Sequence, residues 1–129
     1  MPHAVVHRLN GASPISRRAI IEAVNQALIG ALKVPEDTHP VRLCEYDTDA
    51  FPIPRQSSAA FTLIEATVYP GRTMETKRRL YARLIDELGK AGIAAEDIRI
   101  VLYEVSLENW GLKGGVPASE IDLSFEVEI

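Results

Sequence analysis

Cysteine is almost absent from this 129-residue chain, and histidine is scarce. The only cysteine, Cys44, excludes an internal disulfide, and a lone thiol is typical of a reducing compartment. The histidines His3, His7 and His39 stand in no metal-ligand spacing, so we expect no metal site. The sequence also lacks a leader-like start and any apolar run of bilayer length, which predicts a cytoplasmic protein without membrane contact.

An excess of positive charge is missing as well. Lys and Arg number 14 against 18 Asp and Glu, and the formal net charge of −4 argues against a nucleic-acid partner. The hydrophobic share of 47% and the charged share of 25% exclude a disordered chain. Together with the length, they predict one compact domain over residues 1–129.

An internal repeat organises the sequence. When the chain is compared with itself at a shift of 60 residues, turn glycines, basic pairs and apolar helix positions coincide. The matches are Gly11 with Gly71, Ser13 with Thr73, Arg17-Arg18 with Lys77-Arg78, Val24 with Leu84, and Leu28 with Leu88. We interpret the repeat as a duplication with units of about 2–58 and 59–115. The alternative is that any two strand-helix-strand units share such a pattern.

Each unit has the pattern of a strand, a helix and a returning strand. Residue patterns predict strands at about 3–9, 41–46, 60–69 and 98–105, and helices at about 14–32 and 73–90. Ser13-Pro14 has the composition of an N-cap followed by proline at the first helical position. Strict alternation of apolar and polar residues over about 121–129 predicts a final strand.

These elements predict an α+β architecture. We expect duplicated β-α-β units forming a two-layer sandwich, with two helices on one face of a mixed four-stranded sheet plus the C-terminal strand. No helix remains to cover the other face of the sheet. Because Val, Ile and Leu are frequent in the strands, we expect another subunit to cover that face.

Proline directly after the initiator methionine is the most specific local feature. A small second residue permits removal of Met1, which leaves the secondary amine of Pro2 as the N-terminus. An ordinary α-amino group has a pKa of about 7.7–8.0, so modest desolvation or a nearby cation brings it close to neutrality, where a base works best. The alternative is a start without any role, since Met-Pro beginnings are common.

A run of cations marks the entry to the second helix. Arg72 lies in the predicted turn, and Lys77, Arg78 and Arg79 follow in the early turns of the helix. Cations at this end oppose the helix dipole, so an anionic ligand explains the position of Arg72. For the three residues inside the helix we expect solvation or pairing with nearby acids.

Two loops after the returning strands add further candidates. The glycine-rich stretch 109–115 carries Trp110, which is either the wall of a pocket or plain subunit packing. This stretch lacks the Gly-Lys-Ser/Thr ending of a phosphate loop, so we expect no nucleotide site. In the corresponding loop of the first unit, Arg55 is either a substrate contact or a surface arginine.

Together these features resemble the tautomerase superfamily. The amino-terminal proline, the segment from Tyr69 to Tyr81 and the segment from Glu104 to Gly111 carry the likeness. It is to the longer, internally duplicated members, the group that includes malonate semialdehyde decarboxylase. The resemblance implies a 4-oxalocrotonate tautomerase-like fold, a homotrimer, no cofactor and a small carboxylate substrate. It further implies that Pro2 is the general base or acid and that Arg72 holds the substrate, with Trp110 in the pocket.

Two positions depart from the decarboxylase pattern. Pro70 stands where that pattern has a second arginine, and Thr38 stands where it has an acid, with Asp37 one position away. We therefore favour a keto-enol tautomerase of a small 2-oxo or 2-hydroxy-enoic acid. The second hypothesis is a decarboxylase or hydratase of a small 3-oxo acid, in which Asp37 activates water. The third is a trimeric protein of this fold without turnover, which retention of Met1 favours.

Overall fold

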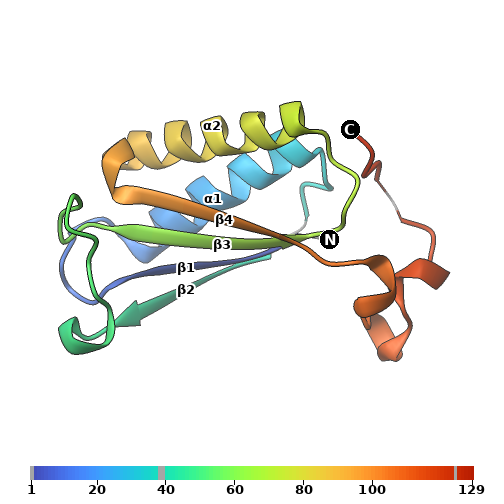
Figure 1. The fold of residues 1–129 in the computed structure, drawn as a ribbon, viewed down its shortest axis with the longest axis horizontal. Coiled ribbons are helices and arrows are strands. Elements are labelled where there is room, and N and C mark those ends of the chain that lie inside the picture. Colours follow the sequence, from blue (N-terminus) through green and yellow to red (C-terminus); the bar gives the residue numbers. More distant parts are fainter. Residues whose placement is uncertain (1, 38–39, 124) are drawn as a thin grey trace.

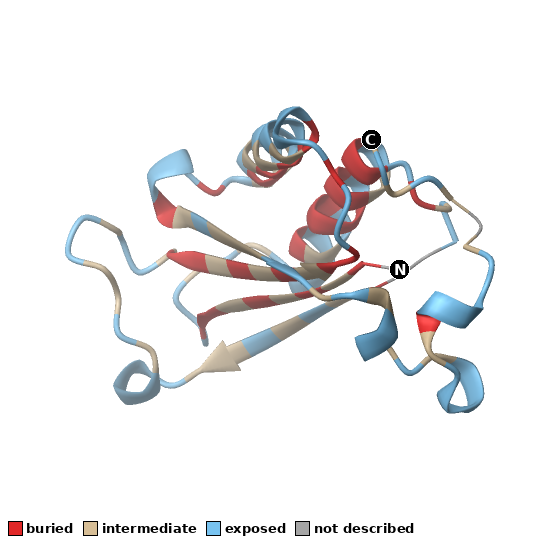
Figure 2. Cartoon of the chain, turned by 45° about the vertical axis from the view of Figure 1, so that its right-hand side comes forward, coloured by how far each residue is buried: buried red, intermediate tan, exposed pale blue. Residues whose placement is uncertain are grey.

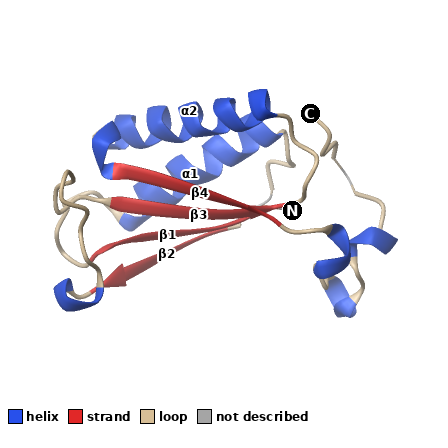
Figure 3. Ribbon diagram, in the orientation of Figure 1, coloured by secondary structure: helices blue, strands red, loops and turns tan. Residues whose placement is uncertain are grey.

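The structure is a computed structural model, and it describes residues 2–37, 40–123 and 125–129 (Figure 1). The main elements are β1 (His3–Leu9), α1 (Arg17–Leu32), β2 (Val41–Tyr46), β3 (Thr62–Val68), α2 (Met74–Ala91) and β4 (Ile98–Glu104). Short 3-10 helices are η1 (Thr48–Ala50), η2 (Ala95–Asp97), η3 (Leu107–Asn109), η4 (Lys113–Gly115) and η5 (Ala118–Glu120) (Figure 3). Neither long helix combines the length and apolarity that crossing a bilayer demands within the residues described.

The four strands form one mixed sheet in the order β2-β1-β3-β4. β1 is parallel to β2, β3 is parallel to β4, and the two central strands are antiparallel to each other. Each β-α-β unit therefore contributes one parallel pair, and the units meet along β1 and β3. Both helices cover the same face of the sheet (Figure 1), which confirms the predicted two-layer α+β sandwich.

The core lies between the helices and the sheet, where buried residues of both layers face one another (Figure 2). Fully buried residues repeat along the two helices at Ile20, Val24 and Leu28, and at Leu80, Leu84 and Leu88. Each member of one trio lies 60 positions from its counterpart in the other. The apolar helix positions that reveal the repeat in the sequence are thus the residues that both helices contribute to the core.

The first helix begins later than the sequence predicts. Ser16 is the N-cap of α1, and its hydroxyl accepts a backbone N–H of the first turn at 3.0 Å. The predicted cap, Ser13, instead accepts the N–H of Ile15 at 3.3 Å. The reason is that the carbonyl oxygen of Ile15 accepts a hydrogen bond from Arg8 Nη1 at 2.8 Å, which holds this stretch outside the helix. In the second unit Thr73, the repeat partner of Ser13, is the N-cap of α2.

The predicted C-terminal strand is wrong for the described residues of 121–129. This segment contains no strand and lies beside the start of α2 (Figures 1 and 3). Alternation of apolar and polar residues is not sufficient for a strand, because a strand also needs a neighbouring backbone edge for its hydrogen bonds. Within one chain the segment lies against the helix layer instead.

The sheet face opposite the helices is uncovered in the single chain (Figure 2). The sequence predicts an apolar face, and the structure shows a mixed one. Half-buried Val5, Leu63 and Val101 share it with exposed Arg42 and Arg99. The apolar residues lie on the two central strands and on β4, so they form a patch that a second subunit can cover.

A row of polar side chains in contact with one another crosses all four strands on this open face. Tyr46 hydroxyl and His7 Nδ1 are 2.5 Å apart, and His7 Nε2 lies 2.7 Å from Glu65 Oε1. Tyr103 hydroxyl donates to Glu65 Oε2 at 2.7 Å, and this hydrogen bond lowers the pKa of the carboxyl. The two tyrosine hydroxyls are hydrogen-bonded in this row, and His7 Nε2 is left with the close contact to Glu65 alone.

Leu84→Ala tests the core. Leu84 is fully buried in α2, so its truncation should lower the free energy of unfolding by about 2–5 kcal/mol, measured by urea denaturation. The matched control is Arg78→Ala, an exposed residue of the same helix, for which we expect a change within about 0.5 kcal/mol. Equal losses in the two variants would contradict this packing.

Candidate active site

The predicted catalytic residues Pro2 and Arg72 lie at the same end of the sheet (Figure 1). β1 and β3 pair in an antiparallel register that sets His3 opposite Thr67. Continuing this register places the buried Pro2 opposite Val68, four residues before Arg72. The start of the chain and the turn into α2 therefore form one corner of the molecule.

A glycine shapes the turn that carries Arg72. Gly71 has a φ of 123°, which strains any residue with a side chain. A Cβ at this position would also lie 3.1 Å from the carbonyl oxygen of Val127. The turn directs Arg72 inward, where only 6% of the residue is exposed, and Thr73 then caps α2.

Only part of the guanidinium of Arg72 is hydrogen-bonded to the described residues. Nη1 donates to the carbonyl oxygen of Tyr69 at 3.1 Å, whereas Nε and Nη2 are buried without a partner among the residues described. Burial lowers the pKa of Arg72, and the carboxylate of Glu104 partly opposes this shift. A buried cation with two unpaired donors favours an anionic ligand, because buried polar groups without hydrogen bonds are costly.

Aromatic side chains surround this cation. The Trp110 ring meets Tyr69 edge-on, with centroids 4.9 Å apart, and Trp110 Nε1 donates to a backbone carbonyl at 2.9 Å. Phe125 stacks on Tyr69 with a centroid distance of 6.1 Å and lies 5.8 Å from Arg72 Cζ. The structure thus brings the predicted Trp110 to the Arg72 corner. The apolar rings reduce the access of water to the guanidinium.

Sequence reasoning missed two members of this wall, Tyr69 and Phe125. Tyr69 directly precedes the turn, so its position before Pro70-Gly71 was an available signal. No local signal exists for Phe125, because it reaches the corner through the C-terminal segment. The hydroxyls of Thr73 and Thr76 hold that segment by donating to the carbonyl oxygen of Ile129.

The two remaining predicted residues lie at different ends of the sheet. Asp37 is exposed in the loop before β2, and in the same loop Pro40 accepts the N–H of Ala4 at 3.1 Å. This places Asp37 near the start of β1, on the side of Pro2. Arg55 is exposed in the loop between β2 and β3, at the opposite end (Figure 1). Arg55 can therefore approach such a corner only from a neighbouring subunit.

The cations inside α2 differ from Arg72 in their environment. Lys77 Nζ pairs with Glu104 Oε1 at 2.9 Å, and Arg79 pairs with Glu75 at 3.3 Å on the helix surface. These contacts confirm the prediction that the helix cations pair with acids or face solvent. Across residues 2–37, 40–123 and 125–129, no group of three or more His, Cys, Asp or Glu side chains gathers as a metal site.

Comparison with known proteins assigns the family. Residues 39–113, more than half of the chain, match the family model described as tautomerase enzyme. A relative from Ralstonia nicotianae, the probable tautomerase RSp0893, is 40% identical over an alignment of 62 residues that covers 44% of this chain and 81% of the relative. The chain belongs to the tautomerase family, as its resemblance implied.

Solved structures share the fold over most of the chain. The FG41 malonate semialdehyde decarboxylase inhibited by 3-bromopropiolate is 28% identical, with a TM-score of 0.77 over 86% of this chain and 88% of that protein. The Q0 fused 4-OT wild-type symmetric trimer is 25% identical, with a TM-score of 0.78 over 90% of this chain and 95% of that protein. The duplicated sheet-and-helix arrangement is therefore common to all three chains.

Gly71→Ala tests the turn that positions Arg72. The strained φ and the close carbonyl of Val127 should lower the free energy of unfolding by about 1–3 kcal/mol, measured by urea denaturation. Gly89→Ala is the matched control, because Gly89 is helical and a Cβ there meets nothing within 4 Å. We expect that variant to gain about 0.5–1 kcal/mol. Destabilisation by both would contradict a role specific to the turn.

Proposed function

We propose that this protein is a cofactor-free keto-enol tautomerase of a small 2-oxo or 2-hydroxy-enoic carboxylate. The observation that carries the proposal is the buried guanidinium of Arg72, whose Nε and Nη2 have no partner within the described chain. It lies at the corner of the molecule that also holds Pro2. Membership of the tautomerase family supports proton transfer as the class of reaction.

The proposed reaction moves one proton between two substrate atoms. With Met1 removed, the neutral nitrogen of Pro2 takes the proton of the enol hydroxyl, and the electrons of that O–H bond form the C=O bond. The electrons of the C=C bond then take the proton from the protonated amine at the carbon. Arg72 holds the carboxylate and stabilises the negative charge that develops on the enolate oxygen.

The aromatic wall strengthens these interactions. Tyr69 is almost fully buried, and Trp110 and Phe125 are half-buried beside it. Apolar rings around a charged pair lower the local dielectric constant, so attraction between the guanidinium and an anion exceeds its value in water. The wall also favours a small, flat substrate.

Decarboxylation or hydration of a small 3-oxo acid is the second candidate function. The similarity to the FG41 malonate semialdehyde decarboxylase, at 28% identity, favours it. The exposed position of Asp37 and the presence of Pro70 in place of a second arginine count against it. A fold member without turnover is the third candidate; retention of Met1, which would keep the amine of Pro2 acylated, and the absence of a second arginine at Pro70 favour it.

We further propose that the chain forms a homotrimer through the open face of its sheet. Val5, Leu63 and Val101 provide an apolar patch there, and polar side chains of all four strands, from Tyr46 to Tyr103, contact one another beside it. The Q0 fused 4-OT, with the same fold, is a symmetric trimer. A trimer would also offer Arg55 a route to the corner of a neighbouring subunit.

Ketonisation of phenylenolpyruvate and 2-hydroxymuconate, followed by ultraviolet absorbance, tests the proposed chemistry. Pro2→Ala should lower kcat by about 10²-fold or more, because a flexible primary amine replaces the ring-fixed base. Arg72→Ala should lower kcat/KM by about 10²- to 10³-fold, because the carboxylate and the enolate lose their cation. All proteins are untagged, and intact mass verifies that Met1 is absent.

Arg78→Ala, an exposed cation of the same helix, is the control and should keep wild-type rates. Full activity of Pro2→Ala in correctly processed protein would exclude the amine as the base. Release of carbon dioxide from a 3-oxo acid, lost in Arg72→Ala and in Asp37→Asn, would establish the second candidate function instead. Retention of Met1 in the cellular protein would favour the third.

Leu63→Lys tests the trimer. Leu63 lies on the open face of the central strand β3, so a buried lysine there should dissociate the assembly. Sedimentation equilibrium should give about three times the chain mass for the wild type and the chain mass for the variant. Arg78→Glu changes charge on the helix layer and should leave the assembly intact. A monomeric wild type would overturn the proposal.

A further inference from the structure

The Arg72 corner has a counterpart in the first β-α-β unit. Arg8 of β1 and Val68 of β3 are 60 positions apart, and they stand opposite Glu45 and Glu104 in the two parallel strand pairs. In each unit the first turn of the helix supplies a base that pairs with this glutamate, at 2.8 Å in the first unit and 2.9 Å in the second. The two units therefore share an ion pair between the first turn of the helix and the end of the returning strand.

A buried guanidinium is present in both units, but its partners differ. Arg8, which is 7% exposed, donates from Nη1 to the Ile15 carbonyl at 2.8 Å. Its Nε and Nη2 lie 3.0 and 2.9 Å from Glu45 Oε2. Arg72 also gives Nη1 to a carbonyl, that of Tyr69, yet its Nε and Nη2 have no partner within the described residues. The edge formed by Nε and Nη2 thus binds a carboxylate in Arg8 of the first unit and none of the described residues in Arg72 of the second.

Glu45 is held as a bound carboxylate ligand would be. Oε2 receives the Arg8 edge, and Oε1 lies 2.8 Å from both Nε and Nη2 of Arg17. The side chain is 14% exposed. The hydrogen bond from Arg17, followed by that from Arg8, lowers the pKa of Glu45, so its carboxylate is ionised at neutral pH.

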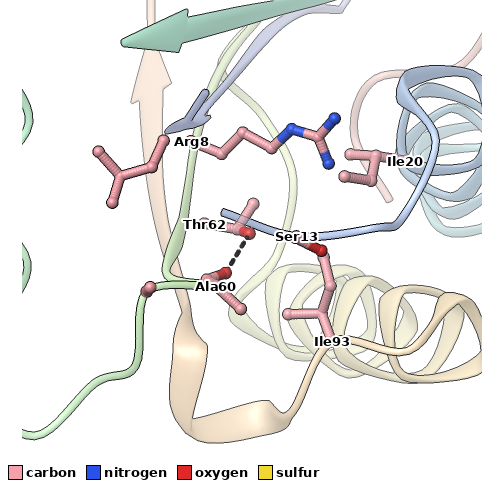
Figure 4. Close-up of a pocket in the computed structure, with 8 residues that line it drawn as sticks. Arg8, Ser13, Ile20, Ala60, Thr62 and Ile93 are labelled. Atoms are coloured by element: carbon pink, nitrogen blue, oxygen red, sulfur yellow. Dashed lines mark hydrogen bonds between the residues drawn. The ribbon is translucent and has the colours of Figure 1, made fainter. Parts of the chain in front are cut away.

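A small pocket lies beside this pair, and Arg8, Thr62 and Ile20 are among the residues that line it (Figure 4). Arg8 lies along it with its guanidinium directed toward α1, and the lining leaves no room for a water molecule. Thr62 stands at the position that corresponds to Pro2. Its nitrogen is part of a peptide bond, and its hydroxyl donates to the Ala60 carbonyl at 3.0 Å. This corner therefore offers neither a free amine nor an unpaired guanidinium edge.

We propose that the first unit contains a second site for a small carboxylate, built from Arg8 and Arg17, and that the side chain of Glu45 occupies it. Removal of the Glu45 side chain opens the first unit to formate or acetate. This proposal does not rest on the proposed catalytic function, since none of its three residues belongs to the Pro2–Arg72 corner.

The test compares the melting temperatures of wild type and Glu45→Ala in sodium chloride and in sodium formate at equal ionic strength. In chloride the variant should melt below the wild type, because two guanidinium groups lose their partner. In formate its Tm should rise by about 3 °C more than that of the wild type, since ligand binding to the folded state stabilises it. Any formate binding at Arg72 is common to both proteins and cancels.

Two control variants assign the effect to the site. Glu45→Gln keeps the space filled, and Arg8→Met/Glu45→Ala removes the buried cation, so both should respond to formate as the wild type does. Equal formate responses of Glu45→Ala and the wild type would overturn the proposal. So would an extra response that persists in the Arg8→Met/Glu45→Ala protein. If Glu45→Ala does not fold in chloride, Glu45→Thr serves in the same comparison, because a β-branched residue suits the strand.

Discussion

The antiparallel pairing of β1 with β3 is the contact on which the candidate active site depends. In this pairing Ala4 stands opposite Ala66 and Val6 opposite Ile64, and all four residues are fully buried. A slip by one residue would turn these side chains toward the open face, so the core fixes the register. The same register sets Pro2 opposite the end of β3, where the turn to Arg72 begins. The geometry of the corner is therefore a consequence of core packing.

The two buried arginines show how one fold can hold a guanidinium in two ways. In the first unit the carboxylate of Glu45 completes the hydrogen bonds of Arg8, and the charge is neutralised within the chain. In the second unit Nε and Nη2 of Arg72 have no partner among the residues that the structure describes, and buried donors without a partner cost stability. Such an unfavourable local arrangement is expected where stability and ligand binding compete.

The repeat and its periodicities were sufficient to predict the strands, both helices and the layer order. These features depend on residues close in sequence, whose spacing decides which face is buried. The start of α1 was mispredicted because a distant side chain, Arg8, binds the carbonyl of Ile15. The C-terminal strand was mispredicted because alternation says nothing about whether a partner edge lies within reach. Both errors arise from contacts between separate segments.

In the candidate site, too, local sequence signals predicted some residues, and contacts between distant segments determined the others. Pro2, Arg72 and Trp110 follow from local motifs and the family resemblance, and the fold brings them to one corner. Phe125 has no local signal, because only the path of the C-terminal segment carries it to Arg72. Nor does composition reveal that Glu45 and Glu104 are equivalent, since their equivalence appears only when strand register is known.

Strand register also shows which residues of the two β-α-β units are equivalent and where the units differ. Both units contain a glutamate at the end of the returning strand, which pairs with a basic residue in the first turn of the helix. Both also contain a row of buried apolar residues along the helix, which belongs to the core. They differ at the positions of Arg8 against Val68 and of Thr62 against Pro2. All four residues at these positions are buried. The ends of the central strands therefore differ between the two units: the buried guanidinium of the first unit pairs with Glu45, whereas Nε and Nη2 of Arg72 have no partner among the described residues.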